Sequence, residues 1–524
     1  MEILPGTSAL LAALLVLYWT WTVVSRLWLS PIAKFPGPKL AALTSWYEFY
    51  YDIVCGGKFP FKVRELHAKY GPVVRINPDE LSVSDPDFYA VLYTGPTKRR
   101  DKWKPVPGQK WVKESVAGSM SHEVHRMRRG ALNPAFSTQR ILNQHKMIDA
   151  KIDRFLERVD GFVDSGETVL FWKLLGALTN DTIMTYCLGS CYNHLDKPSF
   201  NDFKDHNDLL ENLVGGHRMK QFGNFPRIIE ALLFRLPPSW LAKMMPPFRK
   251  MLEEMLMIAN KVRDVQDDFK DISTKRVPKA IFEDILQSKL PEEEKAPDRI
   301  AQDSMTVVLG GTHGTAFALA TGIYYLLASP SILDQLKREL AEAQPDPAVP
   351  LSWKEAEQLP YLKGVIQEAL RLSYGSCARL PRVSPVDVLT VQDKTRGVAW
   401  DIAPGTPVGM SAFQVHHDES IFPKSDAFIP ERWVANPGLD RYMVSFTKGS
   451  RGCLGINLAY AMMFLTFTRL FRVYGSPQVR HQGDRGYLEL RDTRFKDIEF
   501  ASDGFLPLCR NGSHGLQVGV HRYE

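Results

Sequence analysis

A glycine-rich loop around one cysteine constrains the fold more than any other stretch of this 524-residue chain. The loop, FTKGSRGCLG, runs from 446 to 455, and Cys453 lies near its end. Its three glycines allow the backbone to approach a flat group closely and to adopt positive φ beside the cysteine. The apolar run 456–472 predicts a helix directly after the loop, and the dipole of that helix favours a thiolate. We therefore expect the side chain of Cys453 to be a thiolate.

The loop also carries a family signature. Phe446, Arg451 and Cys453, with the glycines at 449 and 455, match the pattern Phe-x-x-Gly-x-Arg-x-Cys-x-Gly. A thiolate that faces a planar metal macrocycle, beside backbone N–H groups, tunes haem iron for O–O cleavage. The chain thus resembles the cytochrome P450 family, in particular microsomal members from fungal secondary metabolism. The resemblance implies a haem b (iron protoporphyrin IX) whose iron is ligated by Cys453, with Phe446 and Arg451 contacting the haem.

Two further segments follow the same family order. Glu368 and Arg371 lie three residues apart and share one face of a predicted helix, where they can pair. The segment FIPERW at 428–433 resembles the family's Pro-Glu-Arg-Phe segment. The resemblance implies that Arg432 joins Glu368 and Arg371 in a triad that supports the cysteine loop.

Arginines suited to the haem propionates also appear in order. The run HRMRR at 125–129 resembles the family's Trp-x-x-x-Arg helix, with His125 in the position of the tryptophan. Arginine forks suit carboxylates, so the resemblance implies propionate contacts from Arg129 and Arg382, with Arg451 a further candidate. His125 can donate a hydrogen bond as an indole N–H does.

The predicted helix 300–328 departs from the family pattern. Where the family usually has an acid and then a threonine, this sequence has His313 and Gly314, and Thr315 follows about 100° further round the helix. The family's local helix widening, acid and alcohol deliver protons to bound dioxygen. Proton delivery by His313, by Thr315 through a water, or by a substrate hydroxyl all stay open. It also stays open that His313 only fills space and that Gly314 makes room for a bulky substrate.

The N-terminus predicts a membrane anchor. Residues 8–24 are almost wholly apolar and span roughly 25 Å as a helix, close to the thickness of a thin bilayer. The exit is bulky and basic, with Arg26, Lys34 and Lys39, which is unlike a cleaved signal peptide and keeps the following domain cytosolic. We predict an anchor at 1–30, a Pro/Gly hinge at 31–44 and a catalytic domain at 45–524. The expected location is the endoplasmic reticulum membrane, crossed once.

Composition and periodicity limit the kind of partner and the class of fold. The net charge of +6 is small and dispersed, which argues against a nucleic-acid partner. Six scattered cysteines do not form the dense framework of a secreted disulfide scaffold. Helical periodicity dominates the middle of the chain, and short alternating runs occur at 73–77 and 81–83. The predicted fold is mainly α with a small β-sheet region.

The leading hypothesis is a monooxygenase that oxidises a hydrophobic small molecule, a terpenoid or polyketide secondary metabolite, using dioxygen and electrons from an NADPH-dependent reductase. An oxygen-independent haem-thiolate isomerase or dehydratase, and a non-catalytic haem-binding protein, are the alternatives. We expect the reductase to dock on a basic face that holds Arg126, Arg128 and Lys448. The segments expected to line the substrate pocket are the loop after Trp103, 222–248, 309–313, 376–380 and 504–506.

Overall fold

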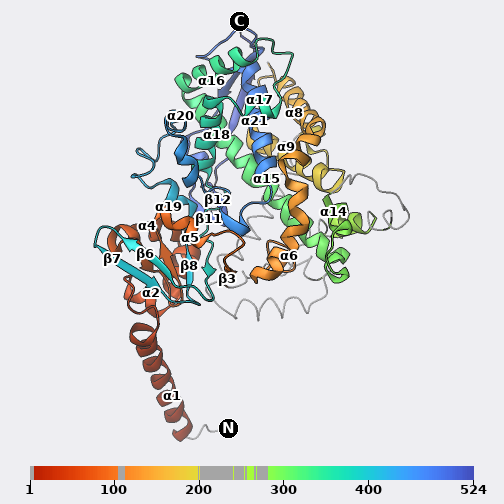
Figure 1. Cartoon of the computed structure of the whole chain (residues 1–524). Coiled ribbons are helices and arrows are strands. Elements are labelled where there is room, and N and C mark those ends of the chain that lie inside the picture. The colour runs from red at the N-terminus through yellow and green to blue at the C-terminus, as the bar shows by residue number, and fades with distance from the viewer. Residues whose placement is uncertain are drawn as a thin grey trace.

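The computed structural model is built mainly of helices, with several small sheets (Figure 1). It describes residues 5–103, 112–163, 165–198, 281–510 and 512–523, together with 200, 240, 253, 256–264 and 267. The predicted mainly α fold with a small sheet region is therefore confirmed. Two of the expected pocket segments, the loop that follows Trp103 and 222–248 apart from residue 240, lie outside the described residues.

A long helix, α15 (Pro297–Ala328), forms the centre of the helical body. It begins with a proline in its first turn, where the missing N–H costs nothing, and ends before Ser329 and Pro330. It packs along α9 (Phe171–Leu188) and against α18 (Pro360–Ser373) and α21 (Ile456–Val473). The surrounding helices include α6 (His122–Leu132), α8 (His145–Asp160), α14 (Ile281–Gln287), α16 (Pro330–Ala343), α17 (Trp353–Ala356), α19 (Ala412–His416) and α20 (Glu431–Ala435).

The largest sheet brings distant segments together in the strand order β1-β2-β8-β5-β3. These strands are β1 (Val73–Arg75), β2 (Leu81–Val83), β8 (Pro407–Gly409), β5 (Arg382–Val383) and β3 (Asp101–Lys102). Lys102 and Arg382 are register partners in the β3–β5 pair. The sheet therefore places two basic residues, 280 positions apart in the chain, next to one another.

The other sheets are smaller. One has the order β4-β13-β10-β9, and two are hairpins, β6 with β7 and β11 with β12. Their strands are β4 (Val169–Leu170), β13 (Gln517–His521), β10 (Gly486–Leu490), β9 (Tyr474–Gly475), β6 (Leu389–Asp393), β7 (Val398–Ile402), β11 (Ser502–Gly504) and β12 (Leu506–Leu508).

The N-terminal helix α1 (Pro5–Val24) projects away from the body, beside α2 (Lys39–Leu43) and α4 (Phe59–Tyr70) (Figure 1). The helix continues as the π-helical segment η1 (Ser25–Leu29), and the window Ala12–Leu29 is long and apolar enough to cross a membrane. The segment after it packs on the body: Phe35 is buried against Trp400, and the N–H of Arg75 donates to the carbonyl of Pro36 at 2.8 Å. The predicted hinge thus follows the surface of the domain.

Close packing at Gly322 in α15 generates a stability prediction. A Cβ at this position would lie 2.5 Å from Cζ of Phe467 and 3.1 Å from Cβ of Ala369, and Phe467 is fully buried and cannot swing aside. Gly322→Ala should therefore lower the free energy of unfolding by about 1–3 kcal/mol. Gly130→Ala in α6 is the matched control, because its Cβ meets no atom within 4 Å; it should gain about 0.5–1 kcal/mol. Equal denaturation midpoints for the two variants would contradict this packing.

Candidate active site

The cysteine loop is held by its own backbone and by residues from an earlier part of the chain. The N–H of Cys453 donates to the carbonyl of Phe446 at 2.8 Å, which closes the loop just before α21. The N–H of Ser450 donates to the carbonyl of Thr94 at 2.9 Å. Gly449 has φ +74° and its Cα lies so close to the carbonyls of Tyr93 and Thr94 that no side chain fits there. Position 449 of the loop therefore requires glycine, because any side chain there would overlap these two carbonyls.

Cys453 lies where the otherwise packed structure is open to solvent. The residue is exposed, whereas most of the helix that follows is buried. The surrounding protein atoms raise the pKa of the Cys453 thiol, while the N–H of Gly455 and the charge of Arg129 act to lower that pKa. Both lowering groups stabilise a thiolate over a thiol.

The predicted triad behind the loop is present as a buried charge cluster. Glu368 and Arg371 are both fully buried and form an ion pair of 2.6 Å. Arg432 lies 2.8 Å from the same carboxylate, and the indole N–H of Trp433 donates to it at 2.8 Å. The guanidinium of Arg371 also donates to the carbonyls of His416, Ser425 and Ala427, which fastens the segment that follows α19 to α18.

Two residues that the sequence did not single out connect this triad to the cysteine loop. His416 contacts the carbonyl of Arg371 at 2.9 Å through Nδ1 and accepts the N–H of Val444 at 3.1 Å through Nε2. Burial and the nearby Arg371 lower the pKa of His416 to about 3, so the ring is neutral and Nδ1 carries the proton. The hydroxyl of Ser445 donates to the carbonyl of Leu370 at 2.7 Å. No local motif marks either residue, because both act through contacts between distant segments.

Five basic residues gather beside the loop, and we refer to them as the cation cluster: Lys102, His125, Arg129, Arg382 and Arg451. None of them forms an ion pair with a carboxylate in the described part of the chain; their hydrogen bonds go mainly to backbone carbonyls. Burial and mutual repulsion lower the pKa of His125 to about 2, that of Lys102 to about 7 and that of Arg451 to about 10. Such unneutralised positive charge favours an anionic ligand.

Hydrogen bonds to backbone carbonyls fix two arginines of the cation cluster. Arg451 donates to the carbonyls of Ser119, Met120 and Ser121, and Arg382 donates to those of Leu380 and Pro381.

Arg129 differs from the other arginines in that it contacts the cysteine loop itself. It donates to the carbonyl of Gly452 at 2.8 Å and to that of Cys453 at 3.4 Å, so it joins α6 to the loop. Nδ1 of His125 and Nε of Arg451 are buried without a hydrogen-bond partner among the described residues. Lys102 was missed by sequence reasoning because only the β3–β5 pairing brings it to Arg382.

In α15 the hydroxyls of Thr312 and Thr315 lie on a different face of the helix from the imidazole of His313. The hydroxyl of Thr312 donates to the carbonyl of Val308 at 2.7 Å and accepts a hydrogen bond from Asn180 of α9 at 3.2 Å. Thr315 is buried, and helical geometry places it on the same α9-facing side as Thr312. His313 is buried on the opposite flank. The structure thus separates Thr315 from His313 by about half a turn of the helix.

Gly310 and Gly314 form an open stripe along α15. Among the residues that the structure describes, a Cβ at either position would meet no atom within 4 Å, whereas one at Gly311 would lie 2.8 Å from Ile183. His313 flanks this stripe, one residue before Gly314. The local widening expected from the family pattern is absent, because α15 is continuous α-helix throughout. The open space beside the middle of α15 arises because Gly310 and Gly314 have no side chains, and the backbone of the helix is not distorted.

Two of the expected pocket segments meet one another. The hydroxyl of Ser376 donates to the carbonyl of Phe505 at 3.0 Å, which joins the turn 376–380 to the tip of the β11–β12 hairpin. Phe505 has φ +69°, a conformation that is costly for a bulky residue and concentrates at functional sites. The N–H of Phe505 is held by the buried carboxylate of Asp503 at 2.7 Å.

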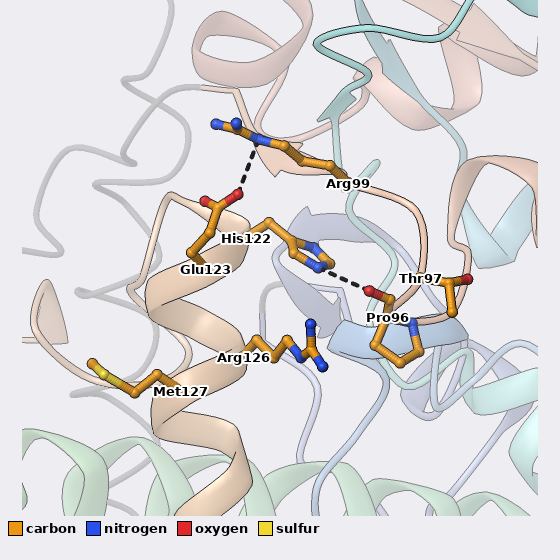
Figure 2. Close-up of a pocket in the computed structure, with 7 residues that line it drawn as sticks. All are labelled: Pro96, Thr97, Arg99, His122, Glu123, Arg126 and Met127. Carbon is orange, nitrogen blue, oxygen red and sulfur yellow. Dashed lines mark hydrogen bonds and ion pairs between the residues drawn. The ribbon is translucent and has the colours of Figure 1, made fainter.

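A surface concavity of about 530 Å³ lies between α6 and the segment 96–99 (Figure 2). His122 contacts the carbonyl of Pro96 at 3.2 Å, and Arg99 lies 3.4 Å from Glu123. Arg126 extends into the concavity beneath His122 (Figure 2).

The three basic residues expected on a docking face differ in whether another group of the protein already binds their charge. Arg126 has no ion pair within the described ranges. Arg128 makes a two-pronged ion pair with Glu294, at 2.7 and 2.9 Å, so its charge is already neutralised. Lys448 is half-buried and bonded to the carbonyl of Arg441. Arg126 is therefore the available basic side chain of the three.

An exposed cysteine before a helix, a buried triad behind it and a cation cluster beside it are the features expected of a haem-thiolate protein, in which the cluster would face the two propionates. Comparison with known proteins narrows the class: the cytochrome P450 family profile matches residues 38–482, and the chain belongs to that family.

Individual relatives agree with the family assignment. The chain is 42% identical to cytochrome P450 monooxygenase tpcC of Cochliobolus heterostrophus, over 99% of this chain and 98% of that protein. It is 39% identical to cytochrome P450 monooxygenase astB of Talaromyces wortmannii, over 97% of this chain and 96% of that protein. It is 36% identical to tryptophan 6-hydroxylase fscE of Fusarium equiseti, over 95% and 94% respectively. The expected monooxygenase class, with fungal secondary-metabolism relatives, is confirmed.

Proposed function

We propose that this cytochrome P450 monooxygenase oxidises a hydrophobic secondary metabolite, of the terpenoid or polyketide class, at the endoplasmic reticulum membrane. The substrate class rests on the apolar character of the expected pocket segments. The relatives support oxidation of a small molecule by a fungal monooxygenase. The location rests on the apolar helix at the N-terminus, with basic residues after it. The single observation that carries the proposal is the exposed thiol of Cys453 beside the cation cluster.

The residues that would hold the haem follow from the geometry. Cys453 supplies the thiolate ligand to the iron. Arg382, Arg451 and Lys102 would supply positive charge for the propionates, and the neutral ring of His125 would supply a hydrogen bond.

Arg129 and Phe446 act on the loop that presents the ligand. Arg129 joins α6 to the loop, and Phe446, whose ring packs 5.2 Å from Tyr460, closes the loop through its carbonyl. When bound, the haem supplies the activation of dioxygen, with the thiolate favouring O–O cleavage.

The chain's own residues position substrate and protons. The open stripe at Gly310 and Gly314 leaves room for the substrate against the backbone of α15. His313 flanks this stripe and stands where the family has an acid, so we assign proton delivery to it. Thr312 is committed to α9 by its hydrogen bonds, and Thr315 lies on the same side. Thr315 is therefore not assigned a catalytic role.

Replacing the proposed ligand tests the haem-thiolate assignment. Cys453→Ala should lose the strongly red-shifted absorption of the reduced carbon monoxide complex, because the iron then lacks its thiolate. Cys509→Ala is the matched control and should keep that absorption, since Cys509 lies far from the loop in sequence and outside the cation cluster. A Cys453→Ala variant with the wild-type spectrum would refute the assignment.

A second test concerns His313. His313→Ala should leave the carbon monoxide spectrum intact and lower turnover by roughly 10²-fold, the low end of what one acid–base group contributes. The quantity to measure is product formed per NADPH consumed, with the substrate identified by metabolite profiling of a deletion strain. Thr315→Val is the matched control and should keep wild-type coupling. Wild-type coupling in His313→Ala would remove His313 from proton delivery, and product without NADPH would favour an oxygen-independent isomerase or dehydratase.

The electron donor is proposed to be an NADPH-dependent reductase that docks over the concavity of Figure 2. Arg126→Glu should slow reduction of the iron by about tenfold at low ionic strength, because the steering charge is reversed. The difference should shrink as salt is added. Lys354→Glu carries the same charge change on α17, away from α6 (Figure 1), and should reduce at the wild-type rate. Equal reduction rates for Arg126→Glu and wild type across ionic strength would rule out this face.

A further inference from the structure

The middle of α15 is held on one side and open on the other. On the held side it meets α9, where a Cβ added to Gly311 would lie 2.8 Å from Ile183. Gly310 and Gly314 are each two residues from Thr312, so they lie about 200° round the helix from it, on the far side. Gly310 is exposed there, although it belongs to the central helix of the body. Contacts with α9 therefore set the rotation of this part of α15 about its own axis.

Three polar residues make the contact between the two helices directional. They are Thr179 and Asn180 of α9 and Thr312 of α15, and we call them the clamp. The amide nitrogen of Asn180 donates to the hydroxyl of Thr312 at 3.2 Å, and that hydroxyl donates to the carbonyl of Val308 at 2.7 Å. The hydroxyl of Thr179 lies 2.9 Å from the carbonyl of Thr312 and shares its proton with two carbonyls of its own helix. All three residues are buried, so bulk water does not compete for these hydrogen bonds.

The clamp sets the direction in which His313 points. His313 follows Thr312 by one residue, so it lies about 100° round the helix from the clamp and about 100° from Gly314. It therefore stands at the border between the held side and the open side of α15. Rotation of the helix would carry the imidazole toward the open side or into the core. The clamp opposes this rotation, because it binds Thr312 through both its hydroxyl and its carbonyl.

Asparagine is an unfavourable residue for the stability of this helix interface. The amide oxygen of Asn180 is buried without a hydrogen-bond partner among the residues that the structure describes, and the residue is 1% exposed. A buried polar atom that stays unpaired destabilises a fold, whereas an apolar side chain of the same shape does not. Leucine has nearly the shape of asparagine, and beside it Thr312 would still donate to Val308. The fold therefore does not require asparagine at 180, and its contribution is the direction that it gives to Thr312.

We propose that Asn180 and Thr179 are positioning residues that hold His313 in place for proton delivery, by fixing the rotation of α15. The proposal rests on the role in proton delivery that the proposed function assigns to His313. An error of about 1 Å in the position of a reacting group can lower a rate by roughly 10²-fold, so a small rotation is enough to matter. The clamp is the contribution of α9 to the reaction, although neither of its two residues touches the reacting atoms.

The infrared stretching frequency of carbon monoxide on the reduced, haem-loaded, full-length protein tests the clamp. This band responds to polar side chains beside the bound gas and needs no substrate. The variants are Asn180→Leu, His313→Ala and the two combined, and Thr312→Val removes the other end of the same hydrogen bond if Asn180→Leu does not fold. Thr182→Val is the matched control, because Thr182 is buried in the same helix and its hydroxyl donates to the carbonyl of Leu178, within α9. Thermal denaturation midpoints are measured for every variant.

The clamp acts through the imidazole, so its effect should vanish when the imidazole is absent. His313→Ala and Asn180→Leu should each shift the band, and the double variant should show the band of His313→Ala. Asn180→Leu should unfold at the wild-type temperature or above it. Product formed per NADPH consumed should fall about tenfold in Asn180→Leu, less than the roughly 10²-fold loss expected for His313→Ala. Thr182→Val should match the wild type in band and in product.

The possible contradictions separate the clamp from the proposed function. A wild-type band in Asn180→Leu and in Thr312→Val, together with a shifted band in His313→Ala, would overturn the clamp and leave His313 in its role. Shifts that add in the double variant would also overturn it, because Asn180 would then act independently of the imidazole. An equal shift in Thr182→Val would show a general loosening of α9 and would overturn the clamp as well. A wild-type band and wild-type coupling in His313→Ala would refute proton delivery by His313, and with it the role of the clamp.

Discussion

The buried ion pair of Glu368 and Arg371 is the interaction on which the rest of the site depends. Both side chains are fully buried, and between them they hold Arg432, Trp433 and three backbone carbonyls. A buried pair is weak evidence for stability by itself, but loss of one partner costs about 3–5 kcal/mol. Every segment that meets at this pair therefore has a single low-energy position. His416 and Ser445 transmit that position to the cysteine loop.

The electrostatics of the site are complementary to a haem. The thiol of Cys453 is at the start of α21, and the cation cluster lies beside it without carboxylate partners in the described part of the chain. The lowered pKa values of Lys102, His125 and Arg451 reflect burial and repulsion within the cluster. A ligand with two carboxylates and a metal would relieve this repulsion and take up the thiolate at the same time, so its binding would stabilise the fold.

Sequence motifs predicted the parts of the site that are local in the chain. The cysteine loop and the pair at Glu368 and Arg371 follow from spacing within ten residues or fewer. His416 and Lys102 could not be predicted in this way, because their roles arise from contacts between segments far apart in sequence. Arg128 shows the same limit: a basic run suggested a docking residue, but Glu294, 166 positions away, neutralises it. The continuous α15 departs from the expected widening.

X-ray absorption at the iron edge of the haem-loaded, full-length protein tests the central claim most directly, because it reports the atoms bound to iron. The account predicts one sulfur ligand in the wild type, and loss of that sulfur in Cys453→Ala while the four porphyrin nitrogens stay. An iron with only nitrogen and oxygen ligands in the wild type, or a sulfur ligand that persists in Cys453→Ala, would contradict it.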